Sequence, residues 1–103
     1  MYVRVVELSS AGSERHDRVV ETMQETIVPA LRRYDGFAGF IGLYDGENQK
    51  AKALLLWESR EAAEAAETEL VPRRRRIFGD LGLTVESQDL YAAPVVALEG
   101  VRA

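Results

Sequence analysis

Two segments with helical spacing each end in a glycine-containing turn that leads directly into a β-strand, and this repeated order most constrains the fold. The first segment has apolar residues at spacings of three and four, which places them on one face of a helix beginning near Ser13: Val19, Val20, Met23, Ile27, Leu31 and Tyr34. Asp35-Gly36 ends that helix, because glycine suits the left-handed backbone position after a last helical turn.

The second helical segment is rich in alanine and glutamate and runs from about residue 60 to residue 70. Ser59 precedes it as a predicted N-cap. Pro72 is expected to bend the chain before a last segment that ends in the turn at 79–82, and Pro29 is expected to kink the first helix, because proline has no backbone N–H to donate.

Four segments have the β-branched, partly alternating pattern of strands, and they lie at residues 2–8, 37–44, 50–58 and 83–91. The turn residues Asp45-Gly46-Glu47-Asn48 join the second and third of them as an antiparallel hairpin. The order strand–helix–strand, strand–helix–strand predicts an α+β fold. It is a ferredoxin-like βαββαβ subunit with a four-stranded antiparallel sheet.

In such a subunit both helices cover one face of the sheet and leave the other face without a cover. A chain of 103 residues has no further element to cover it. We therefore expect a homodimer in which two sheets pack face to face.

Composition excludes several classes of protein. The chain has no cysteine, one histidine and a formal net charge of −4. Disulfides and thiolate metal sites are absent, and we expect no metal and no cofactor. The negative charge argues against nucleic acid as a partner. No apolar run is long enough for a membrane span, so we expect no membrane partner and a cytoplasmic location.

The length indicates one folded domain, which we place at residues 1–92. Pro94 separates it from an apolar tail, Val95-Val96-Ala97-Leu98. We expect residues 93–103 to form an added strand or an arm that lies over the partner subunit, because four exposed apolar residues would invite aggregation.

Three pieces of the sequence carry a resemblance to a known family: the first strand, Val28-Pro29 with Tyr34-Asp35-Gly36-Phe37, and the segment Leu56-Trp57-Glu58-Ser59-Arg60-Glu61-Ala62-Ala63. Over residues 2–92 the chain resembles the dimeric α+β barrel superfamily, and within it the antibiotic biosynthesis monooxygenase-like domains. The resemblance implies a homodimer. Members of this family include cofactor-free oxygenases of polycyclic phenols or quinols, haem-degrading oxygenases and many proteins with no known activity.

Haem-degrading members have an Asn on the first strand, a Trp on the third strand and a His on the second helix. Trp57 matches the tryptophan, but the first strand offers Glu7 and the second helix has no histidine. The resemblance therefore favours a cofactor-independent monooxygenase for a small aromatic or quinol-like substrate, which needs a dry cavity and a few polar groups. The alternative is a non-catalytic module that binds a small apolar or aromatic ligand or serves in assembly.

Trp57 and His16 are the candidate catalytic residues. Trp57 would stack on a flat substrate and donate its indole N–H, or else it packs in the core or an interface. His16 is the only side chain whose ordinary pKa lies near neutrality, which makes it the obvious general base. Its charged neighbours indicate an exposed position, so it matters only if the start of the first helix borders the pocket.

The candidate substrate-binding residues are Tyr34, Tyr44, Phe40, Tyr91 and Arg73. The tyrosines would donate to a bound oxygen, or else they are packing residues. Arg73 opens a run of four arginines that covers all sides of a helix, which is typical of a solvated surface in which Glu69 pairs with Arg73. Its functional alternative is that one arginine turns into the cavity and binds an anionic substrate.

Overall fold

The computed structural model describes residues 1–10 and 16–100. The predicted start of the first helix near Ser13 and the end of the tail lie outside the described residues. The helices are α1 (His16–Thr22), the π-helical turn η1 (Met23–Ile27), α2 (Val28–Leu31) and α3 (Arg60–Asp80). The strands are β1 (Tyr2–Ser10), β2 (Phe37–Asp45), β3 (Lys50–Trp57) and β4 (Leu83–Ala92).

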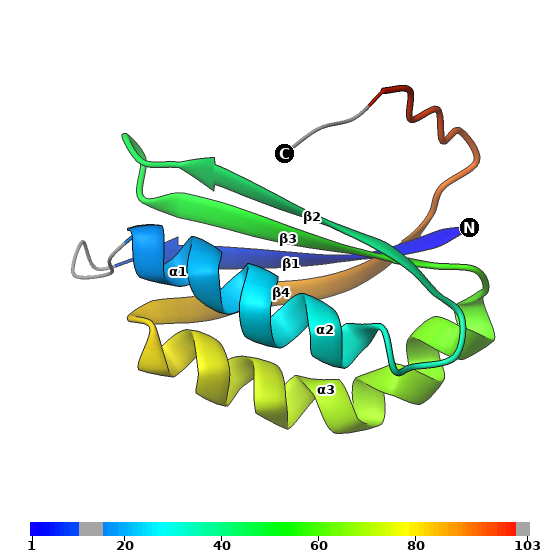
Figure 1. Ribbon diagram of the computed structural model, residues 1–103, viewed down its shortest axis with the longest axis horizontal. Coiled ribbons are helices and arrows are strands. Elements are labelled where there is room, and N and C mark those ends of the chain that lie inside the picture. Colours follow the sequence, from blue (N-terminus) through cyan, green and yellow to red (C-terminus); the bar gives the residue numbers. More distant parts are fainter. Residues whose placement is uncertain (11–15, 101–103) are drawn as a thin grey trace.

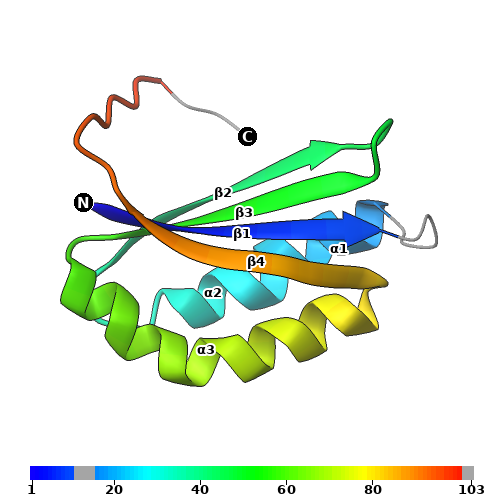
Figure 2. The same cartoon turned by 180° about the vertical axis from the view of Figure 1, so that it is seen from behind.

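The four strands form one antiparallel sheet in the order β2-β3-β1-β4. The two helical layers, α1–η1–α2 and α3, lie side by side on the same face of this sheet (Figures 1 and 2). This is the predicted ferredoxin-like α+β fold. None of the helices in residues 1–10 and 16–100 is long and apolar enough to cross a membrane.

The local signals at the helix ends are confirmed. The Ser59 hydroxyl accepts a 3.1 Å hydrogen bond from the Ala62 N–H and caps α3. Gly36 has a φ of +80°, and its carbonyl accepts a 2.8 Å hydrogen bond from the Glu58 N–H. The Asp45 carboxylate accepts hydrogen bonds from both the backbone and the side chain of Asn48, which fixes the β2–β3 hairpin.

The two prolines are accommodated differently from one another. Pro29 follows the π turn, in which the Val28 N–H donates to the Met23 carbonyl, five residues back. Pro72 lies inside α3, which continues past it to Asp80 as one helix and bends along its length (Figure 1). The helix predicted to run to about residue 70, with a bend at Pro72, thus continues through the bend as a single helix of 21 residues.

The core lies between the sheet and the helices. Alternate residues of the two central strands point toward the helices, among them Val6, Leu8, Ala53 and Leu55. They pack against buried side chains of the helical layer: Val19, Met23, Leu31, Ala63, Ala66 and Phe78.

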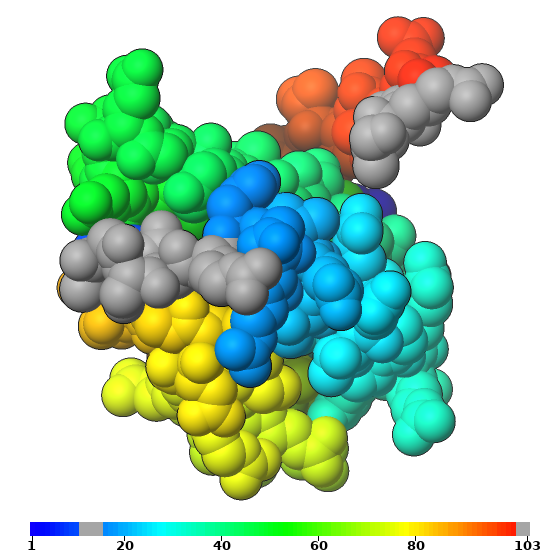
Figure 3. Space-filling view, turned by 60° about the vertical axis from the view of Figure 1, so that its left-hand side comes forward, coloured from blue at the N-terminus to red at the C-terminus, as the bar shows by residue number. Residues whose placement is uncertain are grey.

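The tail after β4 forms no strand within this subunit between Ala93 and Gly100. It leaves the sheet on the side away from α3 (Figures 1 and 2) and projects from the surface of the molecule (Figure 3). Val95 is 84% exposed and Leu98 is 60% exposed. Val95 and Leu98 are therefore largely uncovered inside this subunit.

Candidate functional site

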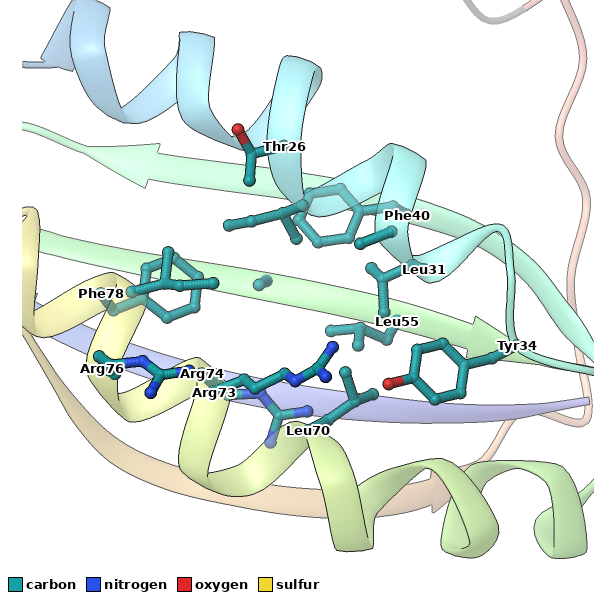
Figure 4. Close-up of a pocket in the computed structure, with 14 residues that line it drawn as sticks. Thr26, Leu31, Tyr34, Phe40, Leu55, Leu70, Arg73, Arg74, Arg76 and Phe78 are labelled. Carbon is teal, nitrogen blue, oxygen red and sulfur yellow. The ribbon is translucent and has the colours of Figure 1, made fainter.

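A cavity of about 350 Å³ lies between the two helical layers and opens over strands β2 and β3 (Figure 4). We name it the arginine cavity. Fourteen described residues line it: Thr26, Ile27, Ala30, Leu31, Tyr34, Phe40, Ala53, Leu55, Leu70, Arg73, Arg74, Arg76, Ile77 and Phe78. Most of this lining is apolar, as expected for a site that binds a small organic molecule.

Tyr34 supplies a hydroxyl to one end of the arginine cavity. It donates a 2.7 Å hydrogen bond to the Glu69 carboxylate on α3. This hydrogen bond, together with burial, raises the pKa of Tyr34 above its ordinary value, while the positive charge of Arg73 acts in the opposite direction. Tyr34 is therefore a neutral phenol at neutral pH, with its proton directed at Glu69 and a guanidinium close by.

Three arginines of α3 line the cavity on the helix side. Figure 4 shows the guanidinium groups of Arg73 and Arg74 on this wall, with the Tyr34 hydroxyl pointing toward the same region. Arg73 and Arg76 are exposed residues whose side chains reach the cavity from the helix surface. We call the three residues Arg73, Arg74 and Arg76 the arginine wall.

Arg74 is different from its neighbours, because its side chain is only 5% exposed. Its Nη2 donates to Oε1 of Glu67 at 2.5 Å, and its Nη1 donates to the other carboxylate oxygen at 3.1 Å. Nη1 also donates to the side-chain oxygen of Gln88 on β4. This two-point pairing fixes the guanidinium beneath α3.

Arg4 on β1 extends the same buried network. Its Nη1 donates a 3.1 Å hydrogen bond to the Gln88 carbonyl, and its Nε lies 3.5 Å from the Glu67 carboxylate. The Arg4 side chain is 11% exposed and that of Glu67 is 16% exposed. Among the described residues the Arg4 Nε has no hydrogen-bond partner. Two guanidinium groups thus share one partly buried carboxylate.

A second cavity, of about 320 Å³, lies beside the start of α1, and we name it the histidine cavity. His16 lines it and stacks on Tyr44 of β2, with ring centroids 4.2 Å apart. Met23 and Gly42 also contribute to its wall. Phe40 lines both cavities and is the aromatic side chain that they share.

The predicted site residues therefore fall into four places: the two cavities, the core and the uncovered face of the sheet. Tyr34, Phe40 and Arg73 meet in the arginine cavity, and His16 and Tyr44 meet in the histidine cavity.

Trp57 lies in neither lining. It is 1% exposed and belongs to the core. Its indole makes edge-to-face contacts with Phe37, at 5.6 Å between ring centroids, and with Tyr34, at 6.4 Å. Trp57 thus packs behind Tyr34, and Tyr34 separates it from the arginine cavity.

Tyr91 lies on the opposite face of the sheet, paired with Val3, and is 57% exposed. It is far from both cavities in the fold, because the cavities lie on the helix-covered face. No group of three or more His, Asp or Glu side chains suitable for a metal ion occurs within residues 1–10 and 16–100.

Comparison with known proteins was made at the levels of sequence and structure. No protein-family model matches the sequence, and neither does any curated protein. A candidate antibiotic biosynthesis monooxygenase from Deinococcus radiodurans, solved at 1.40 Å, has a similar structure. It aligns with a TM-score of 0.69 and 17% identity over 97% of this chain and 100% of that chain. The structural genomics protein YJCS aligns with a TM-score of 0.61 and 12% identity, over 90% of this chain and 99% of that chain.

The predicted resemblance is confirmed at the level of the fold. Both neighbours match over nearly their whole length, so the element order, the sheet and the placement of the helices are shared.

Sequence reasoning did not single out Arg74, Glu67 or Gln88. The arginine run was interpreted as a solvated surface, with one arginine turned into the cavity as the alternative. Arg73 and Arg76 are exposed, whereas Arg74 is buried. Glu67 lies seven residues before Arg74, two turns along one helix face, and this spacing was the available signal. Glu69 was the predicted partner of Arg73, and its carboxylate accepts a hydrogen bond from the Tyr34 hydroxyl.

Proposed function

We propose that the protein is a cofactor-independent monooxygenase that acts on a small aromatic or quinol-like molecule in the arginine cavity. The observation that carries this proposal is an apolar cavity in which the Tyr34 hydroxyl is hydrogen-bonded to a carboxylate and lies near a guanidinium. Such a site has the parts needed to take a proton from a phenol and to stabilise the resulting anion.

The proton has a defined route. Because the Tyr34 proton is directed at Glu69, its oxygen is free to accept a hydrogen bond from a substrate hydroxyl. Transfer of the substrate proton to Tyr34, with transfer of the Tyr34 proton to Glu69, leaves a phenolate in the cavity. Arg73 then stabilises the negative charge. Trp57 acts through Tyr34 by fixing its ring.

The oxidant in this reaction is molecular oxygen. The electron-rich anion reduces it, a carbon–oxygen bond forms at the carbon conjugated with the phenolate, and loss of water gives a carbonyl. For a substrate with a CH₂ group at that carbon, the balance is CH₂ + O₂ → C=O + H₂O. The protein contributes the proton relay, orientation and exclusion of water by walls such as Leu55 and Phe78.

Oxygen uptake with a panel of hydroquinones and anthrone-like phenols tests the proposal. We expect Glu69→Gln and Tyr34→Phe to lower kcat about 100-fold, the usual contribution of a positioned base. His16→Gln is the control and should retain activity, because His16 lines the other cavity. Substrate-dependent uptake that is unchanged in Glu69→Gln would remove the proposed relay.

A second candidate function is binding of a small apolar ligand without catalysis. One observation favours it: no histidine or carboxylate is among the described residues that line the arginine cavity. Saturable binding of an aromatic phenol with no oxygen consumption, in the wild type as in Glu69→Gln, would support this alternative.

We further propose that the protein acts in the cytoplasm as a homodimer formed by its uncovered sheet faces. Ile41, Leu43 and Tyr91 are exposed on the face away from the helices, beside Val3, Val5 and Leu54. The tail, with Val95, Val96 and Leu98, leaves on this side and would lie over the partner. A second copy is the occupant that matches an apolar patch on an otherwise acidic chain.

Sedimentation at micromolar concentration tests the dimer. The wild type should sediment as a dimer and Ile41→Glu as a monomer. Ala65→Glu introduces the same charge on the exposed surface of α3 and should leave the dimer intact. A wild-type monomer would contradict the proposal.

A further inference from the structure

The arginine cavity is positively charged inside a negatively charged chain. Its fourteen described lining residues include Arg73, Arg74 and Arg76 and no carboxylate, whereas the whole chain has a formal net charge of −4. Glu69 lies nearby but is not part of the lining, and it is occupied by the Tyr34 hydroxyl. Arg74 is already paired with Glu67, and a single phenolate at Arg73 leaves the guanidinium of Arg76 without an assigned anion.

The network behind the wall is also short of negative charge. Arg74 is buried and Arg4 is half-buried, and Glu67 is the carboxylate between them. The Arg4 Nε is buried and has no hydrogen-bond partner among the described residues. Glu67 carries one negative charge against these two guanidinium groups, so it leaves no charge to balance the exposed arginines of the wall, and the wall keeps a net positive charge.

The shape of the cavity restricts what kind of anion fits. Phe40, Leu55 and Phe78 provide apolar surfaces suited to a flat ring, and the arginines occupy one side only. Guanidinium groups match the planar two-oxygen geometry of a carboxylate.

We propose that the ligand of the arginine cavity is an aromatic carboxylate, with its ring on the apolar walls and its carboxylate on the arginine wall, held in part by Arg76. The inference rests on the proposed use of this cavity as the substrate site, and it adds a permanent negative charge to the substrate class. The phenolic end lies at Tyr34 and Arg73, and the carboxylate lies farther along α3.

Equilibrium binding of a matched pair of probes tests the inference. Naphthoate and its uncharged carboxamide, naphthamide, have the same ring and nearly the same size, and both are followed by their fluorescence. We expect naphthoate to bind at least tenfold more tightly, as a charge-assisted hydrogen bond allows. Higher ionic strength should weaken naphthoate binding and leave naphthamide binding unchanged.

Two variants separate a specific contact from the general field of the protein. Arg76→Gln should remove most of the preference for naphthoate. Arg75→Gln removes the same charge from an exposed position that lines neither cavity, and it should keep the preference. Because both positions are exposed, both variants should fold.

The outcomes distinguish this inference from the proposed function. Equal binding of naphthoate and naphthamide, or an equal effect of Arg76→Gln and Arg75→Gln, overturns the carboxylate inference and leaves the monooxygenase proposal standing. Binding of neither probe overturns the inference and argues against the cavity as a site. Preferential binding of naphthoate without oxygen uptake by any phenol supports the inference and contradicts the oxygenase.

Discussion

The Tyr34 hydroxyl donates a 2.7 Å hydrogen bond to the Glu69 carboxylate, and this contact joins the end of the first helical layer to the middle of α3. The raised pKa of Tyr34 makes the stability of the fold depend on pH in the alkaline range. A tyrosine with a higher pKa in the folded than in the unfolded state stabilises the fold fully below the unfolded value of about 10. That contribution is lost as the pH rises through the folded pKa.

We therefore expect Tyr34→Phe to lower the free energy of unfolding at neutral pH by about 1 kcal/mol, the worth of one hydrogen bond. The difference from wild type should shrink above pH ~10, where the wild type loses the contribution. Urea unfolding followed across that pH range measures both effects. Tyr91→Phe, on the exposed outer face, is the control and should show neither.

Glu67 is expected to be the most sensitive charged position of the subunit. Glu67→Gln leaves the buried Arg74 and the half-buried Arg4 without a counter-charge and should cost about 3 kcal/mol of unfolding free energy. Glu64→Gln removes a carboxylate that is 59% exposed and lies 3.9 Å from Arg60, and it should cost less than about 1 kcal/mol. Chemical denaturation measures the free energy of unfolding of both variants. Similar midpoints would mean that the buried network does not support the fold.

Gly36 and Gly79 form a matched pair of glycines. At Gly36 the φ of +80° is unfavourable for any side chain, and an added Cβ would lie 2.5 Å from the Cβ of Ala62. Gly36→Ala should therefore destabilise the protein by at least about 2 kcal/mol. Gly79 is helical with open space around it, so Gly79→Ala should stabilise by about 0.5–1 kcal/mol. The midpoint temperature of thermal unfolding should fall for Gly36→Ala and rise for Gly79→Ala.

Phe40 is expected to set the size of ligand that the protein accepts. Its ring lines both cavities, so Phe40→Ala should join them into a larger space. Binding of a three-ring aromatic should then tighten relative to that of a one-ring phenol. Val20 lines the histidine cavity alone, so Val20→Ala should not change this ratio. An unchanged ratio in Phe40→Ala would show that another residue limits ligand size.

The fold was predictable because its signals are local. The Gly36 cap, the Ser59 cap and the Asp45–Asn48 turn each depend on a few neighbouring residues, and the strand and helix periods between them are clear. The order of these elements was enough to select the topology. The second helix is longer than predicted, because a helix stabilised by packing tolerates an internal proline and α3 continues past Pro72 to Asp80.

The site was predictable only in part because its contacts are not local. Tyr34 meets Glu69 across 35 positions, and Arg4 meets Gln88 across 84. No spacing rule connects such pairs. Trp57, the most conspicuous residue of the sequence, is in the core, and Arg74, hidden in a run that suggested solvent, is buried beside the cavity.

The π turn at Met23–Ile27 has a consequence for the length of the chain. Such a turn contains one residue more than an α-helical turn, so the first helical layer carries one residue that its hydrogen bonding does not need. Elsewhere in a helix, loss of one residue rotates one flank against the other by about 100°. Loss of the exposed Glu25 would instead convert the π turn into a regular α-helix. His16 would still face the histidine cavity and Leu31 the arginine cavity, so the helix can be one residue shorter without rearranging either site.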